Sequence, residues 1–231
     1  MDFFKKIGEL FSTKKYLLAL GEGLKTTLII TVCALAIGIV LGALLAVVKI
    51  SASRSKKMKP LSILCDTYIT IIRGTPMALQ LFIMAFAVFA IRGFPLEITA
   101  IITFGLNSGA YVAENLRAGI QSVDKGQMEA GRSLGLSYTA TMCKIVLPQA
   151  VKNVIPSIGN EMISLLKETS IVSMVGLIDL TFSAKIIGAG QNMSDYLVPM
   201  LTTAVMYLII VYGITLLLKL LERRLKSDKR C

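Results

Sequence analysis

Long apolar runs constrain this chain more than any other feature of its sequence. Four runs each exceed the roughly 20 helical residues needed to cross a hydrocarbon core of roughly 30 Å: Leu17–Val48, Leu61–Ile91, Ile98–Ala118 and Tyr196–Leu218. Ala150–Val175 is a fifth, more polar candidate. A backbone inside a bilayer must satisfy its own hydrogen bonds, so each run is predicted to be helical. The sequence therefore predicts an all-α integral membrane protein with about five transmembrane helices, forming a single domain over residues 1–231.

The net charge of +11 could indicate a nucleic-acid partner, but its distribution indicates membrane topology instead. Lys and Arg gather at residues 49–59, between the first two runs, and at 219–230, after the last run. Basic residues beside apolar spans mark cytoplasmic segments. The segments at 92–96 and 176–195 carry one basic residue each, which suits the outside. The pattern predicts an external N-terminus and a cytoplasmic C-terminus, and no nucleic-acid binding.

The N-terminal segment conflicts with this orientation, because it carries Lys5, Lys6, Lys14 and Lys15. With an odd number of spans the two ends of the chain lie on opposite sides of the membrane. Because both ends are basic, one of them must lie outside, against the charge rule. Apolar residues recur here at helical spacing: Phe3, Phe4, Ile7, Leu10 and Phe11. Residues 2–12 are therefore predicted to form an interfacial amphipathic helix, with a frayed basic leader as the alternative. The first apolar run is too long for the hydrophobic region of a cleaved signal peptide.

Nothing in the composition indicates a catalytic or metal centre. The chain has no histidine, and no two of its four cysteines have the spacing of metal ligands. It also lacks a glycine-rich loop ending in Gly-Lys-Ser/Thr, so it encodes no nucleotide site of that type. We therefore expect a protein that is not an enzyme, with no cofactor and no metal of its own.

Two apolar runs contain features that shape helix packing. Arg73-Gly74-Thr75-Pro76 interrupts the second run, because proline removes a backbone donor and disfavours helix at the preceding residue. A break at membrane depth must be buried or line a cavity, so this turn is either a kink or part of a substrate path. Gly38 and Gly42 in the first run form a small-xxx-small pair that lets helices approach closely, unless the pair occurs by chance.

Polar side chains inside the runs define a candidate pocket near the bilayer midplane. Ionisable residues within spans pair with one another or line a pathway. Glu114 has Arg117 three residues later, which allows an intrahelical ion pair, whereas Glu161 has no basic residue three or four positions away. Six residues are the candidates for the pocket, unless they only join helices: Thr26, Tyr111, Glu114, Asn115, Asn160 and Glu161.

The polar stretch at about 121–149 carries the most specific motif. Glu129-Ala130-Gly131 is followed after three residues by Gly135, and after nine more by Ile145-Val146-Leu147-Pro148. The small residues suit a short helix, Glu129–Leu136, that lies in a groove of another protein. Gly135 would end it or permit a turn, and Pro148 would start the next helix. The motif resembles the EAA loop of bacterial ATP-binding-cassette (ABC) importer permeases, departing only at Gly131, where the family usually has Ala.

This resemblance implies a cytoplasmic helix that couples the membrane domain to a separate ATPase. The residues expected to couple are Glu129, Ala130, Gly131, Gly135, Leu147 and Pro148. Other segments are similar to the polar amino-acid uptake subfamily, including Arg73–Pro76, Ser108–Glu114 and Lys167–Ser170. The likeness covers roughly residues 20–220 and implies a methionine-importer-like core in the bacterial cytoplasmic (inner) membrane.

Several partners follow from the resemblance. It implies a second permease copy, a homodimer being favoured over a heterodimer, and two ATPase subunits that bind ATP and Mg. It also implies an extracytoplasmic solute-binding protein, an amino-acid substrate and surrounding membrane lipid. Glu114, Glu161 and Glu168 inside the spans favour a basic L-amino acid, with glutamine as the next candidate.

Two other functions are considered. An ion-driven secondary amino-acid transporter would often show inverted repeats and paired broken helices, and no repeat is evident in the sequence. A membrane scaffold or sensor without transport would not need the polar side chains of the third and fifth runs. The sequence therefore favours a permease subunit that depends on a partner for ATP hydrolysis.

Overall fold

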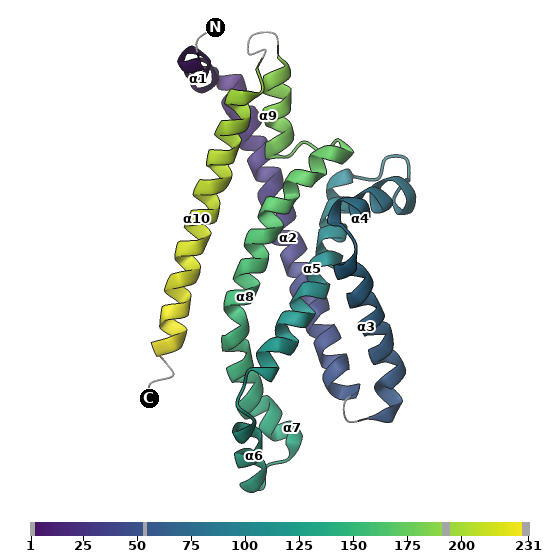
Figure 1. The fold of residues 1–231 in the computed structure, drawn as a ribbon. Helices are drawn as coiled ribbons and strands as arrows, with labels where there is room; N and C mark the ends of the chain where they lie inside the picture. Colours follow the sequence, from purple (N-terminus) through teal and green to yellow (C-terminus); the bar gives the residue numbers. More distant parts are fainter. Residues whose placement is uncertain (1–2, 53–54, 191–194, 228–231) are drawn as a thin grey trace. The chain divides into compact units, whose positions relative to one another are not determined.

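The structure, a computed structural model, describes residues 3–52, 55–190 and 195–227, and all regular elements among them are helices (Figure 1). These residues group into two compact units. Unit 1 comprises Met1–Leu35, Pro76–Gly105 and Met162–Ile214. Unit 2 comprises Ala36–Thr75, Leu106–Glu161 and Thr215–Cys231. The single domain over residues 1–231 stays a prediction.

Within the described ranges, three helices are each long and apolar enough to cross a membrane. They are α2 (Lys14–Ala52), α5 (Leu96–Gln121) and α10 (Leu197–Ser227). They confirm the first, third and fourth predicted runs; α2 extends three or four residues beyond each predicted bound, and α10 continues nine residues past Leu218. The basic end of the chain after residue 227, including Cys231, lies outside the described residues.

The second predicted run is not one straight helix. After the short helix η1 (Lys56–Met58) come α3 (Lys59–Gly74), then α4 (Met77–Ile83) and a π-turn, η2 (Met84–Val88). The α3 and α4–η2 segments meet at an angle of 107°. Thr75 and Pro76 between them adopt extended backbone conformations, because proline cannot continue the helix. The predicted interruption is confirmed, and it is a sharp turn rather than a gentle kink.

The fifth predicted run belongs to a longer helical stretch. It begins with α7 (Tyr138–Thr141) and a π-turn, η3 (Met142–Val146), and continues through α8 (Leu147–Glu168) into a 3₁₀ segment, η4 (Thr169–Val175). The sequence had indicated that Pro148 starts the next helix. Instead, the helical stretch is already continuous from Tyr138, ten residues earlier. Ser137 starts it, because its hydroxyl accepts a hydrogen bond from the Ala140 N–H.

The segment at 176–195, expected to be an external segment, contains a helix that the sequence analysis missed. This helix, α9 (Leu180–Ala189), meets the preceding helical stretch at 48°. Asp179 caps it by accepting hydrogen bonds from the Thr181 and Phe182 N–H groups. If each of the two bent pairs counts as one span, the described residues hold five spans, which agrees with the predicted number.

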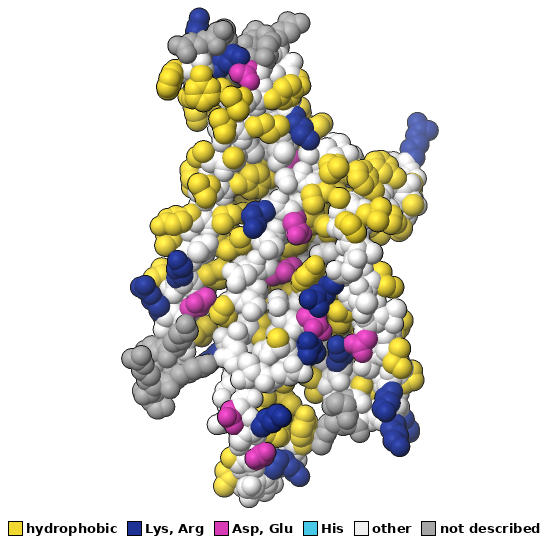
Figure 2. Space-filling view, in the orientation of Figure 1, with side chains coloured by type: hydrophobic (Ala, Val, Ile, Leu, Met, Phe, Trp, Pro, Cys, Tyr) yellow, Lys and Arg dark blue, Asp and Glu magenta, His cyan; other side chains and the backbone are white. Residues whose placement is uncertain are grey.

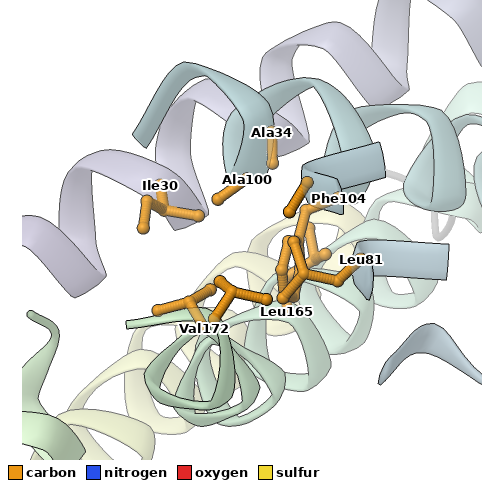
Figure 3. Close-up of a cluster of buried hydrophobic side chains, with 9 residues drawn as sticks. Ile30, Ala34, Leu81, Ala100, Phe104, Leu165 and Val172 are labelled. Atoms are coloured by element: carbon orange, nitrogen blue, oxygen red, sulfur yellow. The ribbon is translucent and has the colours of Figure 1, made fainter. Parts of the chain in front are cut away.

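Each unit has its own apolar core. In unit 1, side chains from α2, α4, α5, α8 and η4 meet in one cluster (Figure 3), which includes Ile30, Leu81, Phe104, Leu165 and Val172. In unit 2, α2 and α5 approach closely. A Cβ added at Gly38 would lie 2.5 Å from Ser108 Oγ, and one at Gly42 would lie 2.6 Å from Val112 Cγ1. The small-xxx-small pair is therefore a packing feature.

The predicted N-terminal amphipathic helix is present as α1 (Phe3–Ser12). Its Leu10 is fully buried in a cluster with Leu20 and Val198 of unit 1. Lys6 Nζ lies 2.8 Å from Asp195 Oδ2, which joins α1 to a residue two positions before α10. Burial of Leu10 and this ion pair rule out a frayed leader over the described residues.

Candidate functional site

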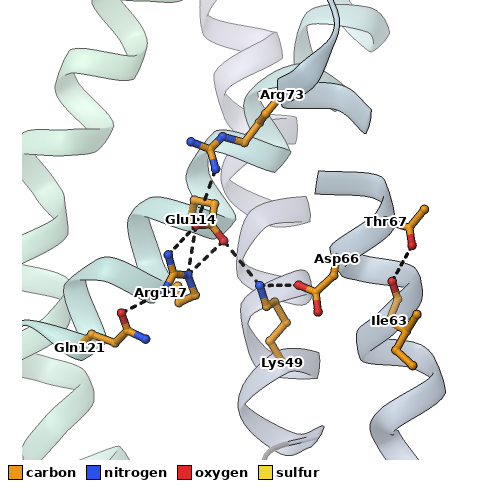
Figure 4. Close-up of polar contacts among 8 residues, drawn as sticks. All are labelled: Lys49, Ile63, Asp66, Thr67, Arg73, Glu114, Arg117 and Gln121. Atoms are coloured by element: carbon orange, nitrogen blue, oxygen red, sulfur yellow. Dashed lines mark hydrogen bonds and ion pairs between the residues drawn. The ribbon is translucent and has the colours of Figure 1, made fainter. Parts of the chain in front are cut away.

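Charged side chains from three helices of unit 2 surround Glu114 on α5 (Figure 4). Arg117 Nε donates to both carboxylate oxygens at 3.1 Å, and its Nη2 lies 2.7 Å from Oε2. Lys49 Nζ on α2 lies 3.5 Å from Oε1, and Arg73 Nη1 on α3 lies 3.7 Å from Oε2. One carboxylate thus joins three cations.

Two further residues extend this Glu114 cluster. Lys49 Nζ lies 2.7 Å from Asp66 Oδ1 on α3, and Arg117 Nη1 donates to Gln121 Oε1 at 2.9 Å. The side chains of Glu114 and Lys49 are only 19% and 21% exposed. Charged groups this far removed from water need partners, and here each has at least one. The intrahelical Glu114–Arg117 pair considered from the sequence is present, together with interhelical contacts.

Arg73 also contacts a second pocket candidate. Its guanidinium carbon lies 5.2 Å from the centroid of the Tyr111 ring, a cation–π geometry. Tyr111 precedes Glu114 by three residues and shares its face of α5. Because α3 ends at Gly74, the turn at Thr75 and Pro76 sets Arg73 at the end of the helix, where it reaches both side chains.

The six predicted pocket residues are only partly brought together. Tyr111 and Glu114 are linked through Arg73, and Asn115 is half-buried beside Glu114 on α5. Asn160 is exposed and Glu161 half-buried on α8, also in unit 2, whereas Thr26 is a half-buried residue of unit 1. The pocket they were predicted to form stays a prediction.

Sequence reasoning missed the partners of Glu114 on other helices. Lys49 had been assigned only to membrane topology, Arg73 to the break and to a subfamily-like segment, and Asp66, the partner of Lys49, had no role. These residues lie 41 to 65 positions from Glu114, so no helical spacing relates them to it. An ionisable residue within a span was the only available signal, and it indicates that a partner exists without identifying that partner.

The predicted coupling segment also lies in unit 2 and forms a short helix, α6 (Lys125–Ser133). Asp124 starts it by accepting a hydrogen bond from the Gly126 N–H at 2.6 Å. At its end, the Leu136 N–H donates to the Gly131 carbonyl and Gly135 adopts φ +83°, a Schellman-type cap. The helix therefore begins and ends earlier than the predicted Glu129–Leu136, and the turn expected at Gly135 is confirmed.

The buried face of α6 packs against α7 and η3. A Cβ added at Gly131 would lie 2.4 Å from Thr141 Cγ2, so this glycine fits where a larger residue would collide. Gln149 Nε2 donates to Gln127 Oε1 at 3.1 Å, which joins the start of α8 to α6. Leu147 is half-buried against an apolar cluster formed by Val123, Met142, Val146 and Ala150, and Pro148 is exposed.

The opposite face of α6 is exposed. Glu129 and Ala130 lie on this face, and Leu134, directly after the helix, has 82% of its surface exposed. An exposed leucine beside small and charged residues, on a helix held rigidly from behind, is suited to contact another protein.

Comparisons with known proteins define the family. Residues 37–227 match the binding-protein-dependent transport system inner membrane component family. The chain is 41% identical to the arginine transport system permease protein ArtQ of Bacillus subtilis, covering 90% of this chain and 92% of ArtQ. It is also 41% identical to the putative glutamine transport system permease protein GlnP of Rickettsia bellii, covering 93% and 95%. The crystal structure of an amino acid ABC transporter with histidines matches with a TM-score of 0.85 and 39% identity, covering 93% and 98%.

The chain therefore belongs to the family of inner-membrane components of binding-protein-dependent transport systems. This confirms the predicted ABC importer permease, an integral protein of the bacterial inner membrane that is not itself an enzyme. The ion-driven secondary transporter is not favoured, because the family works with a binding protein.

Proposed function

We propose that this chain is the permease subunit of an ABC importer that moves a polar, basic L-amino acid into the cytoplasm. The observation that carries the proposal is α6, a capped helix packed from behind, with Glu129, Ala130 and Leu134 exposed. Such a surface suits a groove in an ATPase. Two ATPase subunits would bind ATP and Mg²⁺, so this chain needs no cofactor of its own.

The other partners are an extracytoplasmic solute-binding protein and a second copy of the permease. A homodimer is favoured, because the chain carries both the coupling helix and the polar residues of a pocket. The N-terminus lies outside and the C-terminus in the cytoplasm, which agrees with the basic segments at 49–59 and 219–230.

The substrate pocket is proposed at the five candidates within unit 2, Tyr111, Glu114, Asn115, Asn160 and Glu161, and the part assigned to Thr26 stays a prediction. A zwitterion leaving water needs hydrogen-bonding partners for both its charged ends. The Glu114 cluster offers a carboxylate, three cations and an aromatic ring in a half-buried place. Glu161, on α8 in the same unit, is the residue proposed to neutralise a basic side chain. The arginine and glutamine relatives support a polar amino acid.

The decisive experiment measures ATPase activity and transport in the reconstituted complex with its ATPase and binding protein. We expect a basic amino acid to stimulate both most strongly among the amino acids tested. Glu161→Gln keeps the shape and removes the charge, so transport of arginine or lysine should fall at least tenfold, while basal ATPase activity changes little. Glu22→Gln, at a side chain 73% exposed on α2, is the matched control. Strongest stimulation by glutamine, or full transport of arginine by Glu161→Gln, would contradict the basic substrate.

A further inference from the structure

An apolar groove of about 560 Å³ lies within unit 1, between α1, the start of α2 and α10. Phe3, Ile7 and Phe11 line one wall, at successive turns of α1. Opposite walls come from α2 and from the first four turns of α10, and Thr202 is the only residue with a polar side chain in the lining. The volume falls in the range of about 300–1,000 Å³ that is usual for small-molecule sites. Its lining excludes a polar ligand.

The surroundings of the groove indicate a lipid. The α2 and α10 walls belong to two helices long and apolar enough to span a membrane. Large apolar side chains on these walls are exposed, including Leu17, Leu201, Val205 and Ile209. Figure 2 shows hydrophobic side chains gathered over α1 and the neighbouring part of α10. Acyl chains are the apolar molecules that such a surface meets in a bilayer.

The positively charged side chain of Lys14 lies on the helix that forms one wall of the groove. Lys14 is exposed at the start of α2, one turn before Leu17 and two turns before Gly21, so the three share a helix face. A long lysine side chain at a helix end extends toward the membrane surface, where phosphate groups lie. Lys6, by contrast, is engaged with Asp195. The ion pair of Lys6 and the position of Lys14 beside the groove thus explain why two of the N-terminal lysines can lie outside, although the charge rule for topology disfavours it.

We propose that this groove binds one acyl chain of an anionic phospholipid, with the lipid phosphate held at Lys14. The acyl chain fills the space between α1 and α10, and the phosphate neutralises a lysine that lies on the groove face. Occupancy then secures α1 against the membrane-spanning helices. Charge complementarity commits the groove to an anionic rather than a zwitterionic lipid.

The absence of tryptophan from the chain makes a direct test possible. Phe11→Trp places a fluorescent reporter in the groove wall, and Leu217→Trp places one on α10 outside it, at a residue 63% exposed. The full-length permease, without partner proteins that can carry tryptophan of their own, is reconstituted in phosphatidylcholine containing a small fraction of acyl-brominated quencher lipid. Brominated phosphatidylglycerol should quench the Phe11→Trp reporter with about fivefold higher apparent affinity than brominated phosphatidylcholine. In the Leu217→Trp background, the changes Gly21→Phe and Lys14→Glu should leave the quenching unchanged, because the basic segment at 219–230, not the groove, attracts phosphatidylglycerol there.

Two matched pairs of variants, each in the Phe11→Trp background, separate the groove from general attraction. Gly21→Phe fills the groove without a clash, since no atom lies within 4 Å of an added Cβ, and should abolish the preference. Gly213→Phe, equally unobstructed but outside the groove, should retain it. Lys14→Glu should remove the preference for phosphatidylglycerol, and Lys5→Glu, with the same change in net charge, should leave most of it.

Two results would overturn the proposal. Equal quenching by both lipids at Phe11→Trp would mean that no anionic lipid is selected; if that quenching is also weak, a second copy of the chain covers the groove. A preference that survives both Gly21→Phe and Lys14→Glu would place the lipid elsewhere.

Discussion

At the scale of single residues, Glu114 holds three helices of unit 2 together through its contacts with Lys49, Arg73 and Arg117. Glu114→Gln keeps the side-chain shape but leaves these cations without their shared carboxylate. Removing one partner of a half-buried group of charges leaves the others uncompensated. We therefore expect the free energy of unfolding to fall by about 1–3 kcal/mol. The melting temperature of the purified complex should fall accordingly.

The control for this change is Glu22→Gln, whose exposed partner Lys25 lies 3.4 Å away. Exposed pairs contribute about 0–1 kcal/mol, so its melting temperature should barely move. Equal melting temperatures for the two variants would mean that Glu114 has no structural role, which would leave substrate contact as its function.

The Lys6–Asp195 pair predicts a pH dependence. A hydrogen bond from Lys6, and one from the Leu197 N–H, hold the pKa of Asp195 below its ordinary value. A lowered carboxyl pKa stabilises the folded state at pH values above the unfolded pKa of about 3.9. That stability is lost as the pH falls through the lowered pKa of the folded state, so α1 should stay docked from pH 7 to pH 5 and loosen only below about 4.

Electron paramagnetic resonance can follow this loosening between spin labels at Gly8→Cys on α1 and Leu208→Cys on α10, with the native cysteines replaced. The distance distribution should broaden only at acid pH. In Asp195→Asn it should be equally broad at pH 7 and pH 4. A sharp distribution throughout in this variant would show that Leu10 and its neighbours hold α1 without the ion pair.

At the scale of elements, Gly131 decides how α6 packs on α7. The related permeases usually have alanine at this position, which suggests that Gly131→Ala is harmless. In this chain the added methyl would meet Thr141 Cγ2, so we expect a packing cost of about 1–3 kcal/mol and weaker coupling of ATP hydrolysis to transport. Thr141→Ser removes that methyl and should restore coupling in the double variant. Coupling lost equally in single and double variants would assign the defect to another contact.

The turn after α6 is governed by backbone conformation. Gly135 has φ +83° and no atom within 4 Å of an added Cβ, so a side chain there meets backbone strain rather than crowding. Gly135→Leu should cost about 1–2 kcal/mol and uncouple hydrolysis from transport, whereas Gly135→Asn should do so much less, because Asn visits this conformation. Reconstituted transport per ATP hydrolysed checks both, and equal ratios would contradict the prediction.

The helices that could be predicted from the sequence are those marked by one strong local feature. Apolar length predicted α2, α5 and α10, and Pro76 predicted the break after α3. The helix α9 was missed, because Leu180–Ala189 is too short to stand out as an apolar run, although Asp179 before it is a helix-capping residue type. Nor did the sequence indicate the π-turns η2 and η3, whose extra residue reflects packing of neighbouring segments.

At the scale of the whole molecule, the family and its inner-membrane location followed from sequence, because the motif at 129–148 has fixed spacing and its glycine has a fixed conformational role. The residues of the candidate pocket were predicted less well from the sequence. Residue type marks Glu114 as needing a partner, but the identity of that partner depends on how α2 and α3 pack against α5, which sequence spacing does not encode.

Orientation across the membrane is a property of the whole chain, and its native cysteines provide a test. The basic segments predict that the coupling region is cytoplasmic and that the linker at 92–96 is external. Cys143 in η3 is exposed, so in a variant with the other cysteines replaced it should react with a membrane-impermeant maleimide only after the cells are permeabilised. Arg92→Cys, with all native cysteines replaced, should react in intact cells, because Arg92 is exposed beyond α4 and η2.

Detergent-solubilised protein provides the control that both positions are chemically reactive. Labelling of Cys143 in sealed cells together with protection of Arg92→Cys would reverse the orientation. The coupling helix would then face away from any cytoplasmic ATPase, and the four N-terminal lysines would lie on the cytoplasmic side, as the charge rule alone prefers. The same result would remove the main support for α6 as an ATPase contact, so this experiment tests the topology and the proposed coupling together.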